Sequence, residues 1–310
     1  MHLKGMLEQL EAYWLFQRHL RPSTVRAYRR EVVAYLRWLE EQPWGTDWIE
    51  KLRAVDEKMA ANYIRTALSR RPAAHRANQV PSFLRRKIYA LRSLYEGLNW
   101  MGVRVANPFA RLHPPADDRL PGYLLPAEVR RLLAAIREGR GLTERERASF
   151  EWTGPRDMAI VVLALYQGLA LREICSLDID DVDLTAEQLR VKGRRHLLPL
   201  HPVSTEALAA YLKVRPPAAT VALFLTRRGE RASARTVERI VATWAERAGV
   251  RANPKLLRST FAAHLTAQTS LETETLAELL GYRNPQHVER YRQAALEIKR
   301  QALRKLSYDW

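Results

Sequence analysis

One stretch near the carboxyl end of the chain decides how the fold is interpreted: NPKLLRSTFAAHL, residues 253–265. On a helix, Lys255 and Arg258 are three residues apart and share a face that points away from Leu256 and Phe261. Two cations on one helix face form a clamp for a phosphate group. An exposed amphipathic helix has the same spacing, so the spacing alone leaves both interpretations open.

Two shorter motifs follow this stretch, ELLGYRN at 278–284 and ERY at 289–291. All three resemble motifs of the tyrosine recombinase (phage integrase) family. Its second signature box reads His/Lys-x-x-Arg, then His or Ser, Thr or Ser, and Phe or Ala; its tail places a tyrosine nine residues after Leu-Leu-Gly-His/Trp. The resemblance covers nearly the whole chain. Earlier segments are similar to the start of the family's core-binding domain, to its exit and to the first catalytic box: PSTVRAY at 22–28, Asn107-Pro108, and residues 169–177.

The resemblance implies that Tyr291 attacks a DNA phosphodiester, leaving a 3′-phosphotyrosyl bond and a free 5′-hydroxyl. A phenol with a pKa of about 10 is a poor nucleophile at neutral pH, so positive charge around it must favour the phenolate. Arg258 would grip the non-bridging oxygens, and Lys192 would act as general acid toward the leaving 5′-oxygen. Lys255 takes the position usually held by histidine. The related type IB topoisomerases resemble this chain in having lysine there. Tyr282 replaces the usual His or Trp and would donate one hydrogen bond to the phosphate.

The first catalytic box departs from the family at one position. The family reads Gly-Leu-Arg-x-x-Glu-Leu and this chain reads GLALREI at 168–174, so Ala170 stands where a second phosphate-binding arginine is expected. Arg172 lies about 200° further around a helix and would point elsewhere unless the turn is remodelled. By analogy with one oxyanion donor, the loss costs about 3–4 kcal/mol of transition-state stabilisation. Three explanations stay open: a deliberate Arg-to-Ala change, a natural relative that binds DNA without cutting it, or replacement by Arg172.

Composition limits the partners. The 310 residues hold 51 Lys and Arg against 34 Asp and Glu, which gives a net charge of +17. Residues 1–117 contain 20 basic and 11 acidic residues, and residues 118–310 contain 31 basic and 23 acidic residues, so both parts of the chain are positive. A polyanion is the natural partner, and nucleic acid fits better than a membrane surface. The single cysteine, Cys175, excludes a disulfide framework and is typical of a reducing compartment. With no signal peptide or membrane span in the sequence, we expect a cytoplasmic, nucleoid-associated protein without a membrane partner.

The first third of the chain is predicted to be helical, because apolar residues recur at helical spacing in the segments 5–20, 23–39, 56–69 and 81–100. The second and fourth helices carry arginines away from the apolar stripe. A solvated helix surface explains either face alone, whereas two such faces in one small domain favour a surface that follows DNA phosphates. The candidate DNA contacts are Arg26, Arg29, Arg30, Arg85, Arg86 and Arg92.

A proline-punctuated segment at 107–122 predicts an interdomain linker, which gives domains at 1–116 and 117–310. In the second domain, a strongly apolar helix is predicted at 156–166. A β-hairpin is predicted around residues 189–200. Its basic tip carries Lys192 and two further candidate DNA contacts, Arg194 and Arg195.

The predicted fold class is mainly α: a helical SAM-like core-binding domain and a mixed, mostly α catalytic domain with a small antiparallel β-sheet. The family resemblance implies that the two domains form a C-shaped clamp on double-stranded DNA and that the chain is a site-specific recombinase or integrase needing no metal or other cofactor. It also implies a homo-tetramer on two synapsed sites, exchanging strands through a Holliday junction. The segment 294–306 is similar to the helix that family members dock on a neighbouring protomer; packing on its own protomer is the alternative.

Two other functions stay open on the same fold. A catalytically inactive DNA-binding relative is favoured by Ala170, and footprinting without cleavage would identify it. A type IB topoisomerase-like enzyme is favoured by Lys255, and relaxation of supercoiled plasmid without a specific site would identify that.

Overall fold

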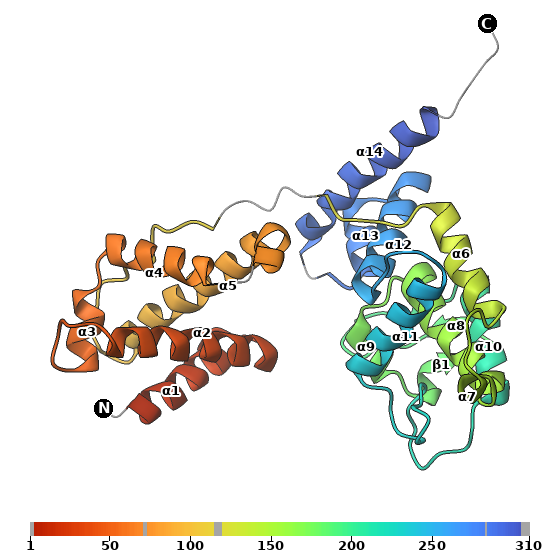
Figure 1. Cartoon of the computed structure of the whole chain (residues 1–310), viewed down its shortest axis with the longest axis horizontal. Coiled ribbons are helices and arrows are strands. Elements are labelled where there is room, and N and C mark those ends of the chain that lie inside the picture. Colours follow the sequence, from red (N-terminus) through yellow and green to blue (C-terminus); the bar gives the residue numbers. More distant parts are fainter. Residues whose placement is uncertain (1–2, 71–72, 115–119, 283, 305–310) are drawn as a thin grey trace, which may run out of the picture. The chain divides into compact units, whose positions relative to one another are not determined.

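The computed structural model describes residues 3–70, 73–114, 120–282 and 284–304 (Figure 1). Contacts divide the chain into two compact units, residues 1–118 and 119–310. The boundary expected between 116 and 117 falls in the segment 115–119, outside the described residues. No helix in the described part of the chain is both long enough and apolar enough to cross a bilayer.

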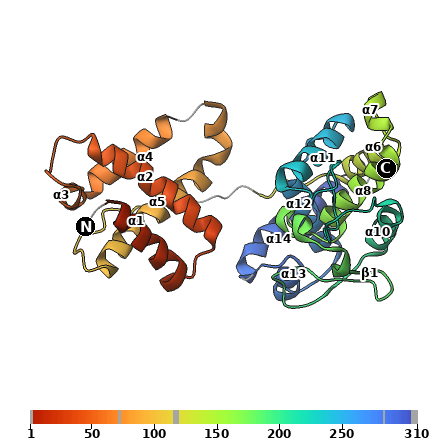
Figure 2. The same ribbon diagram turned by 90° about the horizontal axis from the view of Figure 1, so that it is seen from below.

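The first unit is a set of helices around an aromatic core (Figure 2). Tyr35, Tyr95 and Phe109 are fully buried, and the two phenol oxygens lie 2.9 Å apart. The Tyr95 hydroxyl donates to the Leu52 carbonyl at 3.2 Å, so Tyr35 donates to Tyr95 and both hydroxyls are satisfied. The helices are α1 (Leu3–Ala12), the π-helix η1 (Tyr13–Gln17), α2 (Pro22–Glu40), α3 (Trp48–Ala54), α4 (Glu57–Ser69) and α5 (Ala73–Trp100).

The helices expected in this unit are present, with three differences. The segment predicted as one helix at 5–20 is α1 followed by the π-helix η1, which ends at Gln17. Helix α5 begins at Ala73, eight residues before the predicted start. Helix α3 was not predicted, because seven residues are too few to show an apolar period. Its start is marked instead by Asp47, whose carboxylate accepts hydrogen bonds from the backbone N–H groups of Ile49 and Glu50.

The second unit is mostly helical, with one small sheet (Figure 1). Its helices are α6 (Pro126–Arg137), α7 (Glu144–Arg147), α8 (Phe150–Tyr166), α9 (Leu171–Ser176), η2 (Ile179–Asp181), α10 (Pro202–Val214), α11 (Ala234–Arg247), α12 (Pro254–Gln268), α13 (Thr273–Leu279), η3 (Pro285–Val288) and α14 (Glu289–Leu303). The strands are β1 (Val182–Asp183), β2 (Gln188–Leu189) and β3 (Leu198–Pro199).

Helix α8 forms the centre of this unit. The residues from Ala159 to Leu165 are all buried, as is typical of a helix that is apolar on every side. It packs against α10, α12, α6, α11 and α9. The predicted helix 156–166 is therefore the second half of a longer core helix, whose end determines where the first catalytic box begins.

The sheet is antiparallel with the order β1-β2-β3, as expected. Leu189 pairs with Leu198 in the β2–β3 hairpin, and both side chains are buried. This register leaves Lys192, Arg194 and Arg195 in the connection between the two strands, where the sequence predicts the basic tip.

The turn after α8 requires a glycine. The backbone φ of Gly168 is +59°, in the left-handed region that side chains disfavour. A Cβ at this position would lie 2.3 Å from Cδ1 of Phe261, closer than any real contact. The turn thus presses the end of α8 against α12 and brings the first and second catalytic boxes together.

Candidate active site

Arg258 lies in the first turns of α12 and links three separate segments. Asn253 starts this helix, since its side chain accepts a hydrogen bond from the Leu256 N–H at 2.9 Å. The Arg258 guanidinium, 13% exposed, donates from Nη1 to the Gly168 carbonyl at 3.0 Å and from Nη2 to the Leu280 carbonyl. Its head therefore has a fixed position between the end of α8 and the end of α13.

Glu173 on α9 joins the basic groups of the site. Its carboxylate accepts the Ala170 N–H at 2.6 Å, Arg258 Nη1 at 3.1 Å, and Arg194 through Nε at 2.7 Å and Nη2 at 2.8 Å. Burial by itself raises the pKa of this carboxyl, but the hydrogen bonds from Arg194 and the charges of both guanidinium groups hold the pKa below its ordinary value. Glu173 is therefore an ionised anchor that orients Arg258.

Arg194 differs from its predicted role. The hairpin tip was expected to present it to DNA, but its side chain is only 5% exposed and is held bidentately by Glu173. Its Nη1 also donates to the Leu279 carbonyl at 2.6 Å. A buried guanidinium with three protein acceptors is a structural group here. Arg195, the next residue, is exposed.

Tyr291 lies at the start of α14 and is 4% exposed. Its hydroxyl is 3.4 Å from the Tyr282 hydroxyl. Burial, together with Tyr282, raises the pKa of the Tyr291 phenol to about 12, although Ser259 and Arg258 act in the opposite direction. The positive charge expected to favour the phenolate is thus outweighed by burial, and the phenol keeps its proton at neutral pH.

Tyr282 bridges the arginine and the buried tyrosine. The Arg258 guanidinium lies 5.1 Å from the centroid of the Tyr282 ring, a cation–π contact. The His287 ring contacts it edge-on at 5.9 Å. The Tyr282 hydroxyl therefore lies within the cluster.

Ala170 and Lys255 line the same cavity as Arg258 and Tyr282, with a volume of about 580 Å³. Ala170 precedes α9 in an extended conformation, and a longer side chain there would start from the cavity wall. Arg172 is exposed and does not line this cavity. Of the residues predicted to surround the phosphate, four therefore converge on one cavity, and Tyr291 joins them through Tyr282.

Lys192 is the exception among the predicted catalytic residues. It lies in the β2–β3 connection, half exposed, and its Nζ is 2.6 Å from Oδ2 of Asp178. Arg231 binds the other oxygen of the same carboxylate. The hydrogen bonds from Lys192 and Arg231 hold the pKa of Asp178 below its ordinary value. Lys192 is thus held by an ionised partner outside the cavity.

The predicted DNA-contacting arginines of the first unit fall into three groups. Arg92 donates to the carbonyls of Leu112 at 2.8 Å and Phe109 at 3.3 Å, which anchors the segment after α5. Two others form ion pairs on the surface, Arg29 with Glu11 and Arg86 with Glu31. The remaining three are exposed, without an ion pair to any described carboxylate: Arg26, Arg30 and Arg85.

Glu173 and Ser259 are site residues that sequence reasoning did not single out. Glu173 stands three residues after Ala170, the spacing of a capping box, and that spacing could have indicated its bond to the Ala170 N–H. Nothing in the local sequence indicates that its other contacts are Arg194 and Arg258. Among the described residues, no group of three or more His, Cys, Asp or Glu side chains could hold a metal ion.

Two protein-family models match the chain. The model of the phage integrase family matches residues 123–297, and that of the phage integrase N-terminal SAM-like domain matches residues 7–102. These matches place the chain among the tyrosine-type recombinases, with a SAM-like first unit. The chain belongs to the phage integrase family.

Relatives of known name are similar over most of the chain. Tyrosine recombinase XerC of Pseudomonas entomophila is 30% identical over 290 residues, covering 89% of this chain and 88% of that protein. XerC of Pseudomonas fluorescens is 29% identical with the same coverage. These similarities extend across both units.

Solved structures share the fold at lower identity. XerH site-specific recombinase, in a post-cleavage complex with a palindromic difH substrate, has a TM-score of 0.71 and 16% identity over 96% of this chain and 84% of that one. A lambda integrase tetramer bound to a Holliday junction has a TM-score of 0.67 and 15% identity over 100% of this chain and 80% of that one.

Proposed function

We propose that the chain is a site-specific DNA recombinase that cleaves and rejoins double-stranded DNA through Tyr291. The observation that carries this proposal is the convergence of Arg258, Lys255, Tyr282 and position 170 on one cavity, with the Tyr291 hydroxyl 3.4 Å from that of Tyr282. These residues come from segments that are distant in the sequence. The XerC relatives and the recombinases of the same fold support the assignment.

In the proposed cleavage step, Tyr291 Oη bonds to phosphorus as the bond from phosphorus to the 5′-oxygen breaks. Arg258 stabilises the charge that develops on the non-bridging oxygens. The 5′-oxygen leaves with a proton from Lys192, and the phenol gives its own proton to solvent water. Because the phosphodiester energy is kept in the phosphotyrosyl bond, the reverse attack by a 5′-hydroxyl rejoins the strand.

One contact and one pKa must change before this step. Lys192 has to leave Asp178, 2.6 Å away, to reach a leaving oxygen. The pKa of Tyr291 has to fall from about 12, which a nearby cation would achieve. The family arginine at position 170 is such a cation, so Ala170 weakens both phosphate binding and activation of the nucleophile.

The proposed partner is double-stranded DNA, with Arg26, Arg30 and Arg85 contributing to affinity. A homo-tetramer on two synapsed sites is part of the proposal and is supported by the lambda integrase tetramer of the same fold. In Figure 1, α14 extends away from the body of its unit, and Leu296 and Leu303 on it are 55% and 65% exposed. The first half of α14 packs on α12 of its own unit, with Ala294 and Ala295 buried, so the proposed docking on a neighbouring protomer concerns the exposed second half of the helix.

A DNA-binding relative without cleavage is the second candidate, and Ala170 is the observation that favours it. The test uses a duplex selected by the full chain from a random pool and nicked near the cleavage position, so that a cleaved strand cannot be resealed. Covalent adduct is measured for the parent, for Ala170→Arg, and for Ala170→Arg with Tyr291→Phe.

The recombinase proposal expects Ala170→Arg to form adduct about 100- to 1,000-fold faster than the parent, and the Phe variant to form none. If Ala170→Arg gives a footprint on the DNA but forms no covalent adduct, the result would favour the DNA-binding relative. Relaxation of plasmid that lacks the selected site would favour a topoisomerase.

A further inference from the structure

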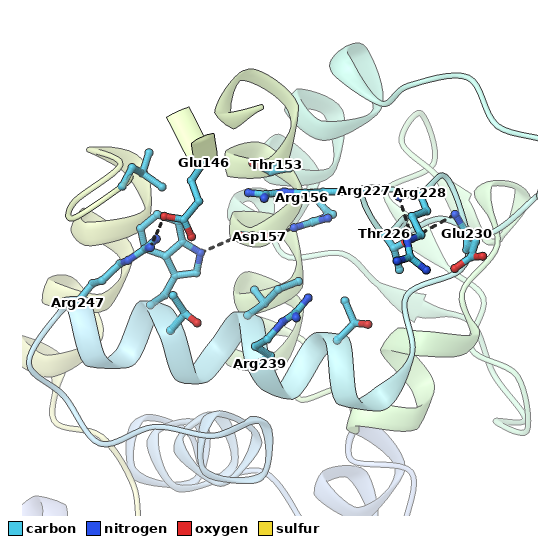
Figure 3. Close-up of a pocket in the computed structure, with 15 residues that line it drawn as sticks. Glu146, Thr153, Arg156, Asp157, Thr226, Arg227, Arg228, Glu230, Arg239 and Arg247 are labelled. Carbon is cyan, nitrogen blue, oxygen red and sulfur yellow. Dashed lines mark hydrogen bonds and ion pairs between the residues drawn. The ribbon is translucent and has the colours of Figure 1, made fainter. Parts of the chain in front are cut away.

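A second cavity of the catalytic unit, of about 590 Å³, shares no lining residue with the cavity at Ala170 and Tyr282. It lies between α8, α11 and the loop 226–231. Figure 3 shows labelled side chains from these segments converging on one hollow. Of its lining residues, only Leu142, Ile240 and Trp244 are apolar. The walls therefore suit a charged ligand and not an apolar one.

The floor of this cavity is a closed ionic network. Arg156, 6% exposed, holds Oδ1 of Asp157 through Nε at 2.9 Å and Nη2 at 2.7 Å. Its Nη1 donates to the Leu225 carbonyl at 2.8 Å, and the Trp244 indole N–H donates to Oδ2 of Asp157 at 2.8 Å. All these groups have partners within the protein, so the network fixes the floor of the cavity.

One rim of the cavity is also neutralised. Arg247 pairs with Glu146 at 2.7 Å, and its guanidinium lies 4.8 Å from the centroid of the Trp244 ring. This pair closes the end of the cavity that faces α7.

The opposite rim carries an excess of positive charge, although the charge of Arg227 also acts on Asp157 of the floor, where it opposes the burial that raises the pKa of that carboxyl. Arg227, Arg228 and Arg239 are exposed, and none forms an ion pair with a described carboxylate. Glu230 is the only other charged residue on this wall, and it likewise has no described ion-pair partner. Three guanidinium groups against one carboxylate leave an excess of two positive charges in a concave site, where their field is strengthened.

The loop that holds two of these arginines is ordered by its own hydrogen bonds. The Thr226 hydroxyl accepts the N–H groups of Arg228 and Glu230, each at 3.3 Å, and the Thr226 N–H donates to the Glu230 carbonyl at 2.7 Å. Gly229 provides the turn with φ of +75°. The arginines are therefore presented from a closed turn against a rigid floor.

We propose that this cavity binds a phosphate group other than the one that Tyr291 attacks, gripped by Arg227, Arg228 and Arg239. Guanidinium groups match phosphate oxygens in geometry and charge. The volume lies in the range of small-ligand sites and also admits one backbone phosphate with its sugar. The phosphate comes from one of two sources, a DNA backbone away from the cleavage position or a free phosphorylated small molecule, and neither depends on strand cleavage.

The test compares two double variants of the full chain. Arg227→Gln with Arg239→Gln removes two charges from the cavity, and Arg145→Gln with Arg147→Gln removes two charges from the exposed face of α7, outside its lining. Thermal unfolding of both should match the parent, because none of the four belongs to the buried network.

Two measurements distinguish the sources. For a DNA phosphate, the slope of log affinity against log salt for a duplex becomes shallower by about 0.9 in the cavity variant, the value for one lost phosphate contact, and stays the same in the α7 variant. For a free ligand, the affinity for tripolyphosphate, measured by calorimetry without DNA, falls at least about 10-fold in the cavity variant alone.

Either result supports the site and assigns its source. Equal effects of the two double variants in both assays, or no effect in either, overturn the proposal. Adduct formation at Tyr291, measured in the Ala170→Arg background at saturating DNA, reports separately on the proposed strand cleavage.

Discussion

Replacing Glu173 by glutamine tests whether this carboxylate holds the active site together. The Glu173→Gln side chain keeps its shape but loses the charge that faces Arg194 and Arg258, whose side chains are 5% and 13% exposed. Removing one partner of a buried pair costs about 3–5 kcal/mol. Because Glu173 is 19% exposed, we expect a cost at the low end of this range, so that the free energy of unfolding of the second unit falls by about 3 kcal/mol. For a unit of this size, that lowers Tm by roughly 6–12 °C.

Calorimetry of the full chain measures this change, with Glu138→Gln as the matched control. Glu138 pairs with Arg140 on the surface, where an ion pair contributes less than about 1 kcal/mol. Adding Arg194→Gln to Glu173→Gln should recover part of the loss, since one uncompensated guanidinium is removed as well. A loss below about 1 kcal/mol for Glu173→Gln, or strictly additive effects in the double variant, would refute the anchoring role.

Three further predictions concern pH and backbone. Glu173 has a lowered pKa when folded, so its contribution is complete above the ordinary carboxyl pKa and is lost as pH falls through the folded value; acid unfolding of Glu173→Gln should show a weaker pH dependence than that of the parent. Tyr291 has a raised pKa of about 12, so its difference absorbance against Tyr291→Phe should show no ionisation at pH 10, and a midpoint at or below 10 would contradict its burial. Gly168→Ala should destabilise the second unit by more than about 2 kcal/mol, because backbone strain and the clash with Phe261 add. The control is Gly249→Ala: Gly249 has a φ of +64° and open space around it, so backbone strain alone should cost about 1 kcal/mol. Equal losses of stability in the two variants would exclude the clash.

The fold was largely predictable from the sequence because its signals are local. The apolar stripe of residues 23–39 and the continuous apolar run within α8 each identify a helix without knowledge of the rest of the chain. The β2–β3 hairpin is bounded by short apolar runs that also stand out locally. Helix α3 escaped prediction because only the cap at Asp47 marks it.

The candidate site was predictable in its members and less so in its contacts. The spacing of Lys255, Arg258, Tyr282 and Tyr291 follows a motif, and the fold brings the four together. That Arg194 turns inward depends on Glu173, 21 residues earlier in the chain, and on Gly281, where a Cβ would lie 3.0 Å from Arg194 Nε. Such pairings between distant segments leave no periodic signal in one sequence.

The bond between Glu173 and the Ala170 N–H has an evolutionary consequence. Since the backbone of residue 170 provides this contact, the start of α9 is secured whichever side chain stands there. The Ala170 side chain itself opens onto a cavity, which leaves room for a longer side chain. A lineage can therefore lose the arginine at this position, or regain it, by a single substitution that the scaffold tolerates without compensation elsewhere.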